Sequence, residues 1–240
     1  MQAILFAALV GLANLLGGLM ITFGLRRRAG TLDVLVAFGG GFMLAVALLE
    51  MLPNAVGTPG ALTAVLVGYL AVHLTQHTLT PHFHFGEETH HDAMVSRRVG
   101  VWAFVGLVPH AFFDGVAIAS GFLAGRDLGL LIFAAVILHK IPTGVSLASI
   151  MLASGNSTVQ TVAAVGVVSA CTVLGALATP ASSFLVRYGL ALAAGVTVYV
   201  AASNLIPESQ RVPGWRIPGA VFLGVLAFYL VRLLLPGGHA

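Results

Sequence analysis

The stretch Val99-Gly-Val-Trp-Ala-Phe-Val-Gly-Leu-Val-Pro-His110-Ala-Phe-Phe-Asp114-Gly-Val-Ala-Ile-Ala-Ser-Gly-Phe-Leu-Ala124 decides the fold of this chain. It is long and apolar enough to cross a membrane as a helix, since about 20 residues span a hydrocarbon core of roughly 30 Å. His110 and Asp114 lie near its middle, and their i, i+4 spacing puts both on one helix face. Ionisable groups at such depth are costly and mark functional sites, so we expect a membrane helix that carries one.

The same pattern recurs 29 positions further along the chain. There His139-Lys-Ile-Pro-Thr-Gly-Val-Ser-Leu-Ala-Ser149 matches His110-Ala-Phe-Phe-Asp-Gly-Val-Ala-Ile-Ala-Ser120 at its His, Gly, Val, Ala and Ser positions. Pro109 and Pro142 lie beside the two motifs. Proline frees a carbonyl inside a helix, and such backbone is tolerated at membrane depth where it lines a cavity or is buried in protein. Two helices are therefore predicted to present ligand-type side chains at the same depth.

The composition places the whole chain in the membrane. Hydrophobic residues make up 58% of it and charged residues only 8%, with a mean hydropathy of +1.01, whereas soluble domains are about 25% charged. The net charge of +3 lies mostly on arginines between apolar runs, so no nucleic-acid partner is expected. The first run, 3–25, has no basic segment before it and is predicted to be a retained span. We expect a single transmembrane domain over residues 1–240.

Eight apolar runs predict an all-α integral membrane protein with eight transmembrane helices. Positive charge gathers in cytoplasmic loops, and the arginines of the short loops divide seven against two in favour of both termini lying outside the cytoplasm. Arg232, near the end of the last run, is expected to reach the outer interface. The predicted runs are 3–25, 34–53, 60–80, 99–124, 128–153, 158–182, 187–206 and 216–235.

A second internal match has an offset of 154 residues. Residues 41–53 and 195–207 share Gly, Ala and Pro positions, and Glu50 aligns with Asn204, each three residues before its proline. The two segments would cross the membrane in opposite directions, as would the predicted helices 99–124 and 128–153. Inverted repeats with a site at their interface are typical of secondary transporters.

His110, Asp114 and His139 form the predicted metal site. Imidazole suits zinc, copper, iron or nickel, and one ion could bridge two histidines and the carboxylate. Three such ligands leave an exchangeable position, which suits transport or catalysis better than a closed structural site. The alternative is that each histidine makes a hydrogen bond across the bundle without meeting a metal ion.

Lys140 complicates this site, because an ammonium group at this depth is costly unless it is paired or faces water. It could pair with Asp114 and compete with a bound cation, carry a proton, or lie in a water-filled vestibule. The sequence does not rank these three roles.

Two further polar residues lie near the ends of predicted spans. Glu50 is either an entrance ligand or an interfacial residue in water. Asn204 and Glu208 are placed similarly near the predicted inner face, where an exit role is considered, although Glu208 reads better as part of a loop.

Residues 81–97 are predicted to form a His-rich cytoplasmic loop. It contains His82-Phe-His-Phe-Gly-Glu-Glu-Thr-His-His-Asp92 and follows His73 and His77, which are spaced i, i+4. Such tracts indicate loose metal binding, so the loop could collect or sense ions. The alternative is a solvated polar loop with no specific ligand geometry.

These motifs resemble those of the ZIP family of divalent-metal transporters. The resemblance implies eight membrane helices, outward termini and a variable His-rich loop after the third helix. The family's fourth helix carries a pattern like H-N-x-x-D/E-G, and its fifth carries H-E-x-P-H-E or Q-D/N-x-P-E-G. The fourth-helix pattern is matched here by His110, Asp114 and Gly115, and the fifth-helix pattern by His139, Pro142 and Gly144. The family's second helix often ends in H-x-x-P, which corresponds to Glu50 and Pro53. Its seventh helix ends in D-x-x-P-E, which corresponds to Asn204, Pro207 and Glu208.

Three positions depart from the family patterns. Ala111 replaces Asn, Lys140 replaces an acidic residue or Asn, and Thr143 replaces His or Glu. In the family these positions help to form a two-metal centre. An ammonium group in place of a ligand would repel a second ion, so we expect one ion here, with Thr143 as a weak oxygen ligand at best.

The resemblance implies a transporter that moves a divalent transition metal, zinc first, into the cytoplasm by alternating access. The expected partners are the ion, the lipid bilayer and a second copy in a homodimer, with no prosthetic group and no enzymatic activity. Two alternatives are an intramembrane zinc hydrolase, which the lack of an H-E-x-x-H motif disfavours, and a diverged metal sensor that does not transport. The expected metal ligands are His110, Asp114, His139, Thr143, Glu50 and Asn204, with Lys140 modulating them.

Overall fold

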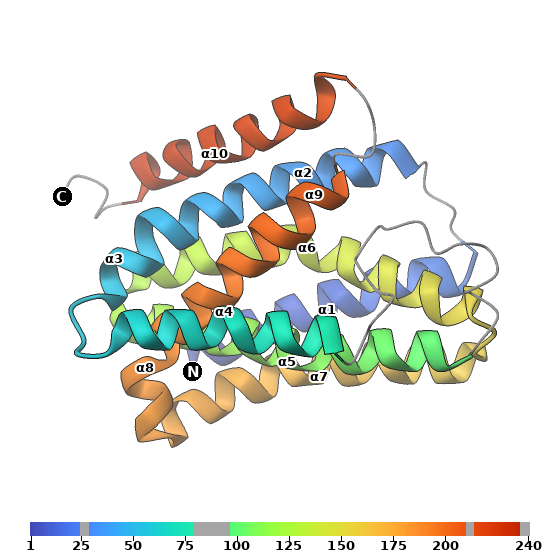
Figure 1. Cartoon of the computed structure of the whole chain (residues 1–240), viewed down its shortest axis with the longest axis horizontal. Coiled ribbons are helices and arrows are strands. Elements are labelled where there is room, and N and C mark those ends of the chain that lie inside the picture. Colours follow the sequence, from blue (N-terminus) through green and yellow to red (C-terminus); the bar gives the residue numbers. More distant parts are fainter. Residues whose placement is uncertain (25–28, 79–96, 210–213, 236–240) are drawn as a thin grey trace.

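The computed structural model describes residues 1–24, 29–78, 97–209 and 214–235 (Figure 1). All regular structure within these ranges is helical, which confirms the predicted all-α class. The elements in chain order are α1 (Gln2–Thr22), α2 (Ala29–Val46), the π-helical η1 (Ala47–Met51), α3 (Leu52–Ala55), α4 (Ala61–Thr78), α5 (Arg97–Ala124), α6 (Arg126–Ala153), α7 (Thr158–Ala181), α8 (Ser183–Tyr199), the π-helical η3 (Val200–Leu205), α9 (Ile206–Ser209) and α10 (Arg216–Leu234).

These elements make eight helical rods, as predicted. The elements α2, η1 and α3 form one rod without a break, and α8, η3 and α9 form another. Among the described residues, seven rods are long and apolar enough to cross a membrane, whereas the apolar part of α4 is the shorter Ala61–Gln76. The predicted third run, 60–80, extends past residue 78, where the described part of α4 ends.

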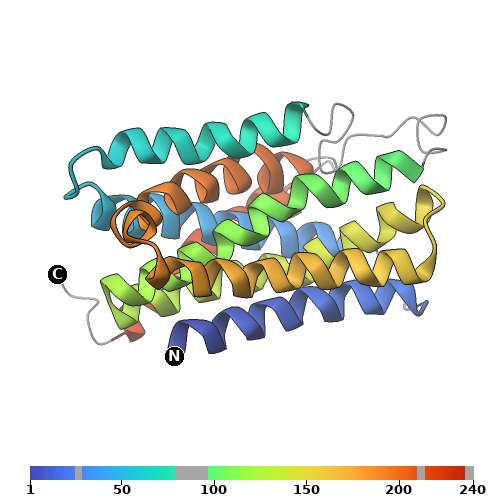
Figure 2. The same ribbon diagram turned by 90° about the horizontal axis from the view of Figure 1, so that it is seen from below.

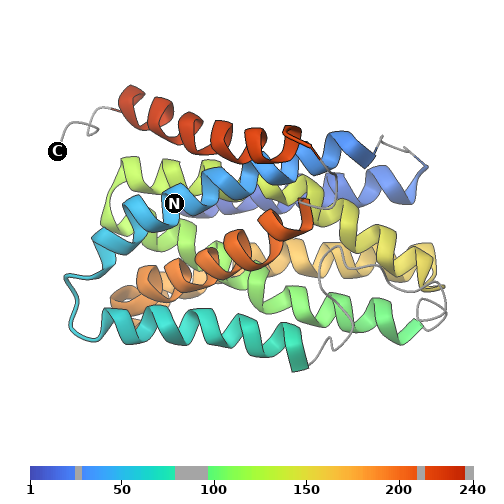
Figure 3. The same cartoon turned by 45° about the horizontal axis from the view of Figure 1, so that its top comes forward.

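The rods form an inner and an outer set. The rods that contain α2, α5, α6 and α8 bury most of their spans, whereas α1, α7 and α10 leave larger shares exposed. Each inner rod is backed by an outer one, because α1 packs on α6, α7 on α5, α10 on α2 and α4 on α8. Figure 3 shows α10 lying along α2, and Figure 2 shows α1 beside α7.

Glycines allow each of these four pairs to approach closely. A Cβ on either glycine of a pair would overlap a carbonyl oxygen of the facing helix, so the backbones touch where the glycines lie. The contacts are reciprocal, with one glycine from each helix. Gly17 and Gly144 join α1 to α6, Gly115 and Gly175 join α5 to α7, Gly41 and Gly224 join α2 to α10, and Gly68 and Gly195 join α4 to α8.

This arrangement agrees with the predicted inverted repeats. The helices α5 and α6 run in opposite directions, and so do α2 and α8 (Figure 1). The 154-residue offset carries η1 onto residues 201–205, which lie within η3, so both rods change from α- to π-helical geometry at the same repeat position. The symmetry also extends to the outer rods, since α1 and α7, and α4 and α10, occupy equivalent places.

Some predictions fall outside the described residues. The His-rich tract is one of them, since only Arg97 of residues 81–97 is described, and so are the arginines at 26–28 and 211. The start of α1 and the end of α10 lie toward the same end of the bundle (Figure 2).

Candidate metal site

Helix α5 places His110 and Asp114 on one face, pointing into the bundle. Nε2 of His110 lies 3.3 Å from Oδ2 of Asp114. Both side chains are buried, at 3% exposure each. Pro109 does not interrupt α5, so the i, i+4 geometry expected from the sequence is kept.

Helix α6 supplies His139, Lys140 and Thr143, which are all buried. Nδ1 of His139 lies 3.3 Å from the carbonyl oxygen of Ala135, one turn earlier. Donation of the Nδ1 proton to that carbonyl leaves the lone pair on Nε2, which is the usual arrangement of a metal-binding imidazole. The Thr143 hydroxyl donates to the carbonyl oxygen of His139 at 2.8 Å, so its own lone pairs remain as weak acceptors.

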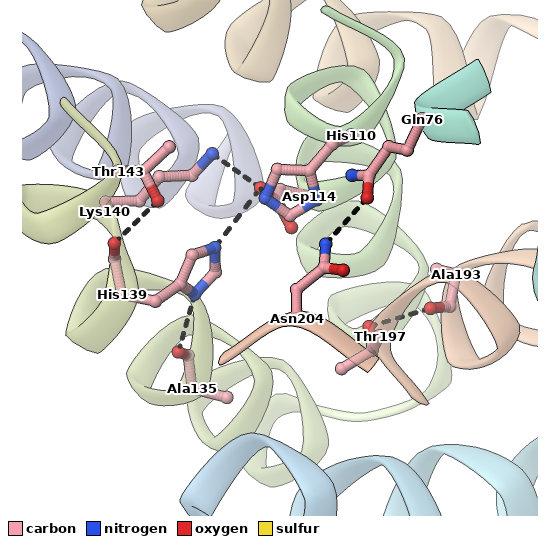
Figure 4. A network of polar contacts seen from close by, with 10 residues as sticks. All are labelled: Gln76, His110, Asp114, Ala135, His139, Lys140, Thr143, Ala193, Thr197 and Asn204. Atoms are coloured by element: carbon pink, nitrogen blue, oxygen red, sulfur yellow. Dashed lines mark hydrogen bonds and ion pairs between the residues drawn. The ribbon is translucent and has the colours of Figure 1, made fainter. Parts of the chain in front are cut away.

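Three nitrogen atoms converge on one oxygen, Oδ2 of Asp114 (Figure 4). His110 Nε2 lies at 3.3 Å, His139 Nε2 at 3.6 Å and the Lys140 ammonium at 2.5 Å. The two imidazole rings are 5.4 Å apart between centroids. The structure therefore brings together three of the six predicted ligands, His110, Asp114 and His139, and the predicted modulator Lys140.

The spacing of the three ligands suits a tetrahedral ion. Zinc with bonds of about 2.0 to 2.1 Å holds its ligand atoms roughly 3.3 Å apart. The two histidine-to-aspartate distances are close to this value, and the ligand atoms of His110, Asp114 and His139 all lie within 4.8 Å of one another. A small inward movement of one imidazole would complete the set.

Lys140 realises the first of its three predicted roles, pairing with Asp114. It is fully buried, and a charge at this depth needs a counter-charge, which the carboxylate supplies. The ammonium group contacts the oxygen that an ion held by His110, Asp114 and His139 would use, so such an ion would have to displace it.

A small cavity adjoins the site. Its volume is about 20 Å³, and it is lined by Gln76, Leu107, His110, His139, Thr143, Val200, Asn204 and Leu205. A single water needs roughly 10 to 15 Å³ by a comparable measure, so the cavity has room for about one small guest. Asn204 of η3 thus lies next to the histidines, where its Nδ2 donates to Oε1 of Gln76 at 2.8 Å.

Glu50 lies apart from the histidines. Its carboxylate accepts from Nε of Arg232 at 2.8 Å, in a pair whose side chains are 14% and 33% exposed. Arg232, which was expected to reach the outer interface, pairs with Glu50 and so joins α10 to η1. The side chain of Glu208 is outside the described part of the chain, as is that of His77, while His73 packs against Tyr69 and Tyr199.

The sequence reasoning missed Gln76. It is a carboxamide near the end of an apolar run, 9% exposed, and it faces the cavity from α4. The sequence did contain a signal for it, since an amide inside an apolar helix needs a polar partner.

The comparison with protein families agrees with the motifs. The model of the ZIP zinc transporter family matches residues 86–234, which is more than half of the chain and includes α5, α6 and α10. The matched segment contains Asn204 and the residues around Asp114, and it leaves out Glu50 and Gln76. The residues around Asp114 are His110, His139, Lys140 and Thr143. No curated protein matches the chain.

Proposed function

Since the chain belongs to the ZIP family of zinc and metal transporters, we propose that it carries a divalent transition-metal ion, zinc foremost, through the site formed by His110, Asp114 and His139. The observation that carries the proposal is the convergence of two imidazoles and a carboxylate, all buried, within the matched segment. Buried ionisable groups of this kind in membrane helices are typical of transport sites.

Family membership also decides between transport and catalysis. A ZIP family protein is a transporter and not an enzyme, so the alternative of an intramembrane zinc hydrolase is excluded.

The donor set favours zinc and ions like it. Two imidazole nitrogens and one carboxylate oxygen suit a borderline ion, and three ligands leave a position for exchange. The Lys140 ammonium stands where a second ion would need a ligand, which supports transport of one ion at a time. When a divalent ion binds, Lys140 must leave Asp114. Because the ion brings two positive charges to a single carboxylate, the ammonium group must move away or lose its proton to limit the buried positive charge.

The route is proposed from the two repeats. Glu50 would receive the ion at one end after release of Arg232, and Asn204 would take it on the far side of the histidines. The resemblance to the family implies movement into the cytoplasm by alternating access, with both termini outside. The loop at 81–97 would then collect ions in the cytoplasm, and a homodimer stays a prediction.

An uptake experiment tests the function. The purified protein would be placed in liposomes, and the initial rate of ⁶⁵Zn uptake measured for the wild type, His110→Ala and Asp114→Ala. We expect uptake by the wild type and its loss in both variants. Thr179→Ala is the matched control, because Thr179 is buried but donates only within its own helix α7. Equal uptake by all four proteins would refute the site.

A second candidate function is that of a diverged family member that no longer transports, and that senses or binds a partner with the Lys140–Asp114 pair in place of the ion. The 2.5 Å contact is the observation that favours it. Metal analysis after purification in excess zinc separates the two candidates. Transport requires bound zinc in the wild type, whereas the second candidate predicts zinc only after Lys140 is replaced by Met.

A further inference from the structure

A pocket lies at one end of the bundle, and none of its lining residues belongs to the Asp114 cluster. Its volume is about 430 Å³, within the range of about 300 to 1,000 Å³ that is typical of pockets for small molecules. Four helices form its walls, namely the start of α1, the last turns of α5, the start of α6 and the last turns of α7. Figure 2 shows these four segments toward the same end of the bundle.

The walls of the pocket are largely apolar. Ala119 of α5 and Ala176 of α7 lie on them with exposures of 3% and 1%, and such short side chains leave room for a guest. The ring of Phe122 forms another wall and stacks on Phe6 of α1, with the ring centroids 5.1 Å apart. Helix α6 closes on the same ring, because a Cβ at Gly129 would overlap it. Three helices therefore hold this aromatic wall in place, and its chemistry favours a hydrocarbon guest.

Arg126 brings a positive charge to this apolar pocket. Among the described residues that line the pocket, it has the only ionisable side chain, since Asp127 follows it in α6 without lining the pocket. Its guanidinium makes no ion pair within the described part of the chain. Arg126 begins a membrane span directly after the span Arg97–Ala124 ends, so it lies where the hydrocarbon core meets water. A phosphate group would meet the guanidinium at this level, because Arg binds phosphate through two parallel hydrogen bonds.

We propose that this pocket binds an anionic phospholipid of the bilayer, with its phosphate on Arg126 and part of one acyl chain against Phe122. The bilayer surrounds the bundle and supplies this ligand. A single basic side chain near the membrane surface strengthens the binding of an anionic lipid by about fivefold. The proposal does not depend on metal transport, since the pocket shares no residue with the Asp114 cluster.

A lipid in this pocket would contact four helices at once. Helices α5 and α6 carry the Asp114 cluster, and α1 and α7 are the helices that back them. A ligand that binds only the folded bundle stabilises it. Added lipid should therefore raise the unfolding temperature of the purified protein, as long as the pocket can accept the lipid.

The experiment measures lipid affinity in purified, delipidated protein. Palmitoyl-oleoyl phosphatidylglycerol or the corresponding phosphatidylcholine would be titrated in, and the bound lipids counted by native mass spectrometry. We expect the wild type to bind phosphatidylglycerol more tightly than phosphatidylcholine. Arg126→Gln should lower the affinity for phosphatidylglycerol by about fivefold, and Arg126→Lys, which keeps the charge, should stay closer to the wild type.

A second kind of variant fills the pocket and keeps its charge. Ala3→Trp places a large ring in the pocket from α1, and it should lower the affinity for both lipids. Leu123→Trp narrows the pocket from α5 and tests the same point at a side chain that is 57% exposed, so the core is not disturbed. In these variants the lipid-induced rise in unfolding temperature should disappear together with lipid binding.

Two matched controls lie outside the pocket. Arg187 lies near the start of α8, which follows the end of α7 directly, and its guanidinium lies 5.2 Å from the ring centroid of Tyr188. Ala8 is an exposed residue of α1. Neither residue lines the pocket, so Arg187→Gln and Ala8→Trp should bind both lipids as the wild type does.

A competition with sodium phosphate identifies the source of the phosphate group. Phosphate in excess should leave phosphatidylglycerol bound, because the acyl chain contributes to the affinity. Complete displacement would overturn the proposal in favour of a soluble anion. Wild-type lipid affinities in both Arg126→Gln and Ala3→Trp would also overturn it, and so would an equal loss in Arg187→Gln. Zinc uptake is measured separately, and its absence would overturn the proposed function while the lipid site stands.

Discussion

The inner helices form two repeat-related pairs, α5 with α6 and α2 with α8, and the two pairs use their polar residues differently. In α5 and α6 the polar side chains point at each other and meet at one carboxylate oxygen. In the other pair they contact the backing helices, since Glu50 of η1 contacts Arg232 of α10 and Asn204 of η3 contacts Gln76 of α4.

The comparison shows that the two repeats have the same backbone geometry but differ in the chemistry of their side chains. The reciprocal glycine contacts and the two π-helical segments hold the repeats in matching geometry. On this shared frame, Asp114 in α5 corresponds to Thr143 in α6, and the ion pair of Glu50 corresponds to the amide pair of Asn204. Symmetric backbones therefore support a cluster with one carboxylate, and the proposed route has a charged residue, Glu50, at one end and a neutral residue, Asn204, at the other.

The largest expected effect comes from breaking the Lys140–Asp114 pair in the first of these helix pairs. Lys140→Met leaves a buried carboxylate without its closest cation, which typically costs about 3 to 5 kcal/mol. The metal-free protein should unfold at a clearly lower temperature in detergent. Zinc should restore most of the loss, because an ion that binds only the folded state stabilises it.

The same variant should bind zinc more tightly than the wild type, since the competitor for Asp114 is gone. Calorimetric titration of the two proteins measures this, and Lys140→Arg, which keeps a positive charge, is the matched control. Equal affinity in Lys140→Met and the wild type would mean that the ammonium and the ion do not share the carboxylate.

An intermediate effect is expected from the glycines that give both pairs the same frame. Gly115→Ala and Gly144→Ala in one pair, and Gly41→Ala and Gly195→Ala in the other, each drive a Cβ into a facing carbonyl. Overpacking of this kind costs about 1 to 3 kcal/mol. If the two repeats have the same backbone geometry, the drop in thermal stability should be similar for Gly115→Ala and Gly144→Ala, and likewise for Gly41→Ala and Gly195→Ala.

Gly166 provides the control for these substitutions. It lies inside α7 and a Cβ there would meet nothing within 4 Å. Gly166→Ala should therefore leave stability unchanged or raise it by up to about 1 kcal/mol, because Ala favours a helix more than Gly does. A loss as large as that of Gly115→Ala would show that close approach of the backbones does not explain the series.

The smallest effect is expected at the ion pair of the second helix pair. Glu50→Gln removes one charge of a partly exposed contact, which contributes about 1 kcal/mol or less. Zinc affinity at the first site should stay at the wild-type value, since Glu50 does not lie among its ligands. Arg232→Gln is the companion variant, and a large change in zinc affinity in either one would place Glu50 in the first site.

The fold was predictable from particular residues. Long apolar runs interrupted by arginines, Gly/Pro turns and polar loops located the eight rods, because hydrophobic length is what a bilayer selects. The i, i+4 spacing of His110 and Asp114 and the repeat at His139 located the buried cluster, since helical geometry makes that spacing a shared face. The sequence also predicted a single carboxylate in the cluster, because Thr143 stands in the second motif where Asp114 stands in the first.

The partners of isolated polar residues were not predictable in the same way. Gln76 and Asn204 are separated by 128 positions in the sequence, and Glu50 and Arg232 by 182. No local periodicity relates such residues, because their contact depends on which outer helix backs which inner one. The pairing of outer with inner helices depends on the close contacts at the glycines. A glycine in a sequence does not show which backbone it contacts.

The sequence by itself determined that this protein is a helical membrane protein with repeated motifs and a cluster of two histidines and an aspartate at one depth. These properties follow from hydropathy and from helical spacing, which act within one segment at a time. Only the tertiary structure decided that Lys140 takes the oxygen of Asp114, that Glu50 turns toward Arg232 and that Gln76 closes a cavity beside His110. Those choices depend on how the helices cross, since a buried charge or amide pairs with whatever group the neighbouring helix brings within reach.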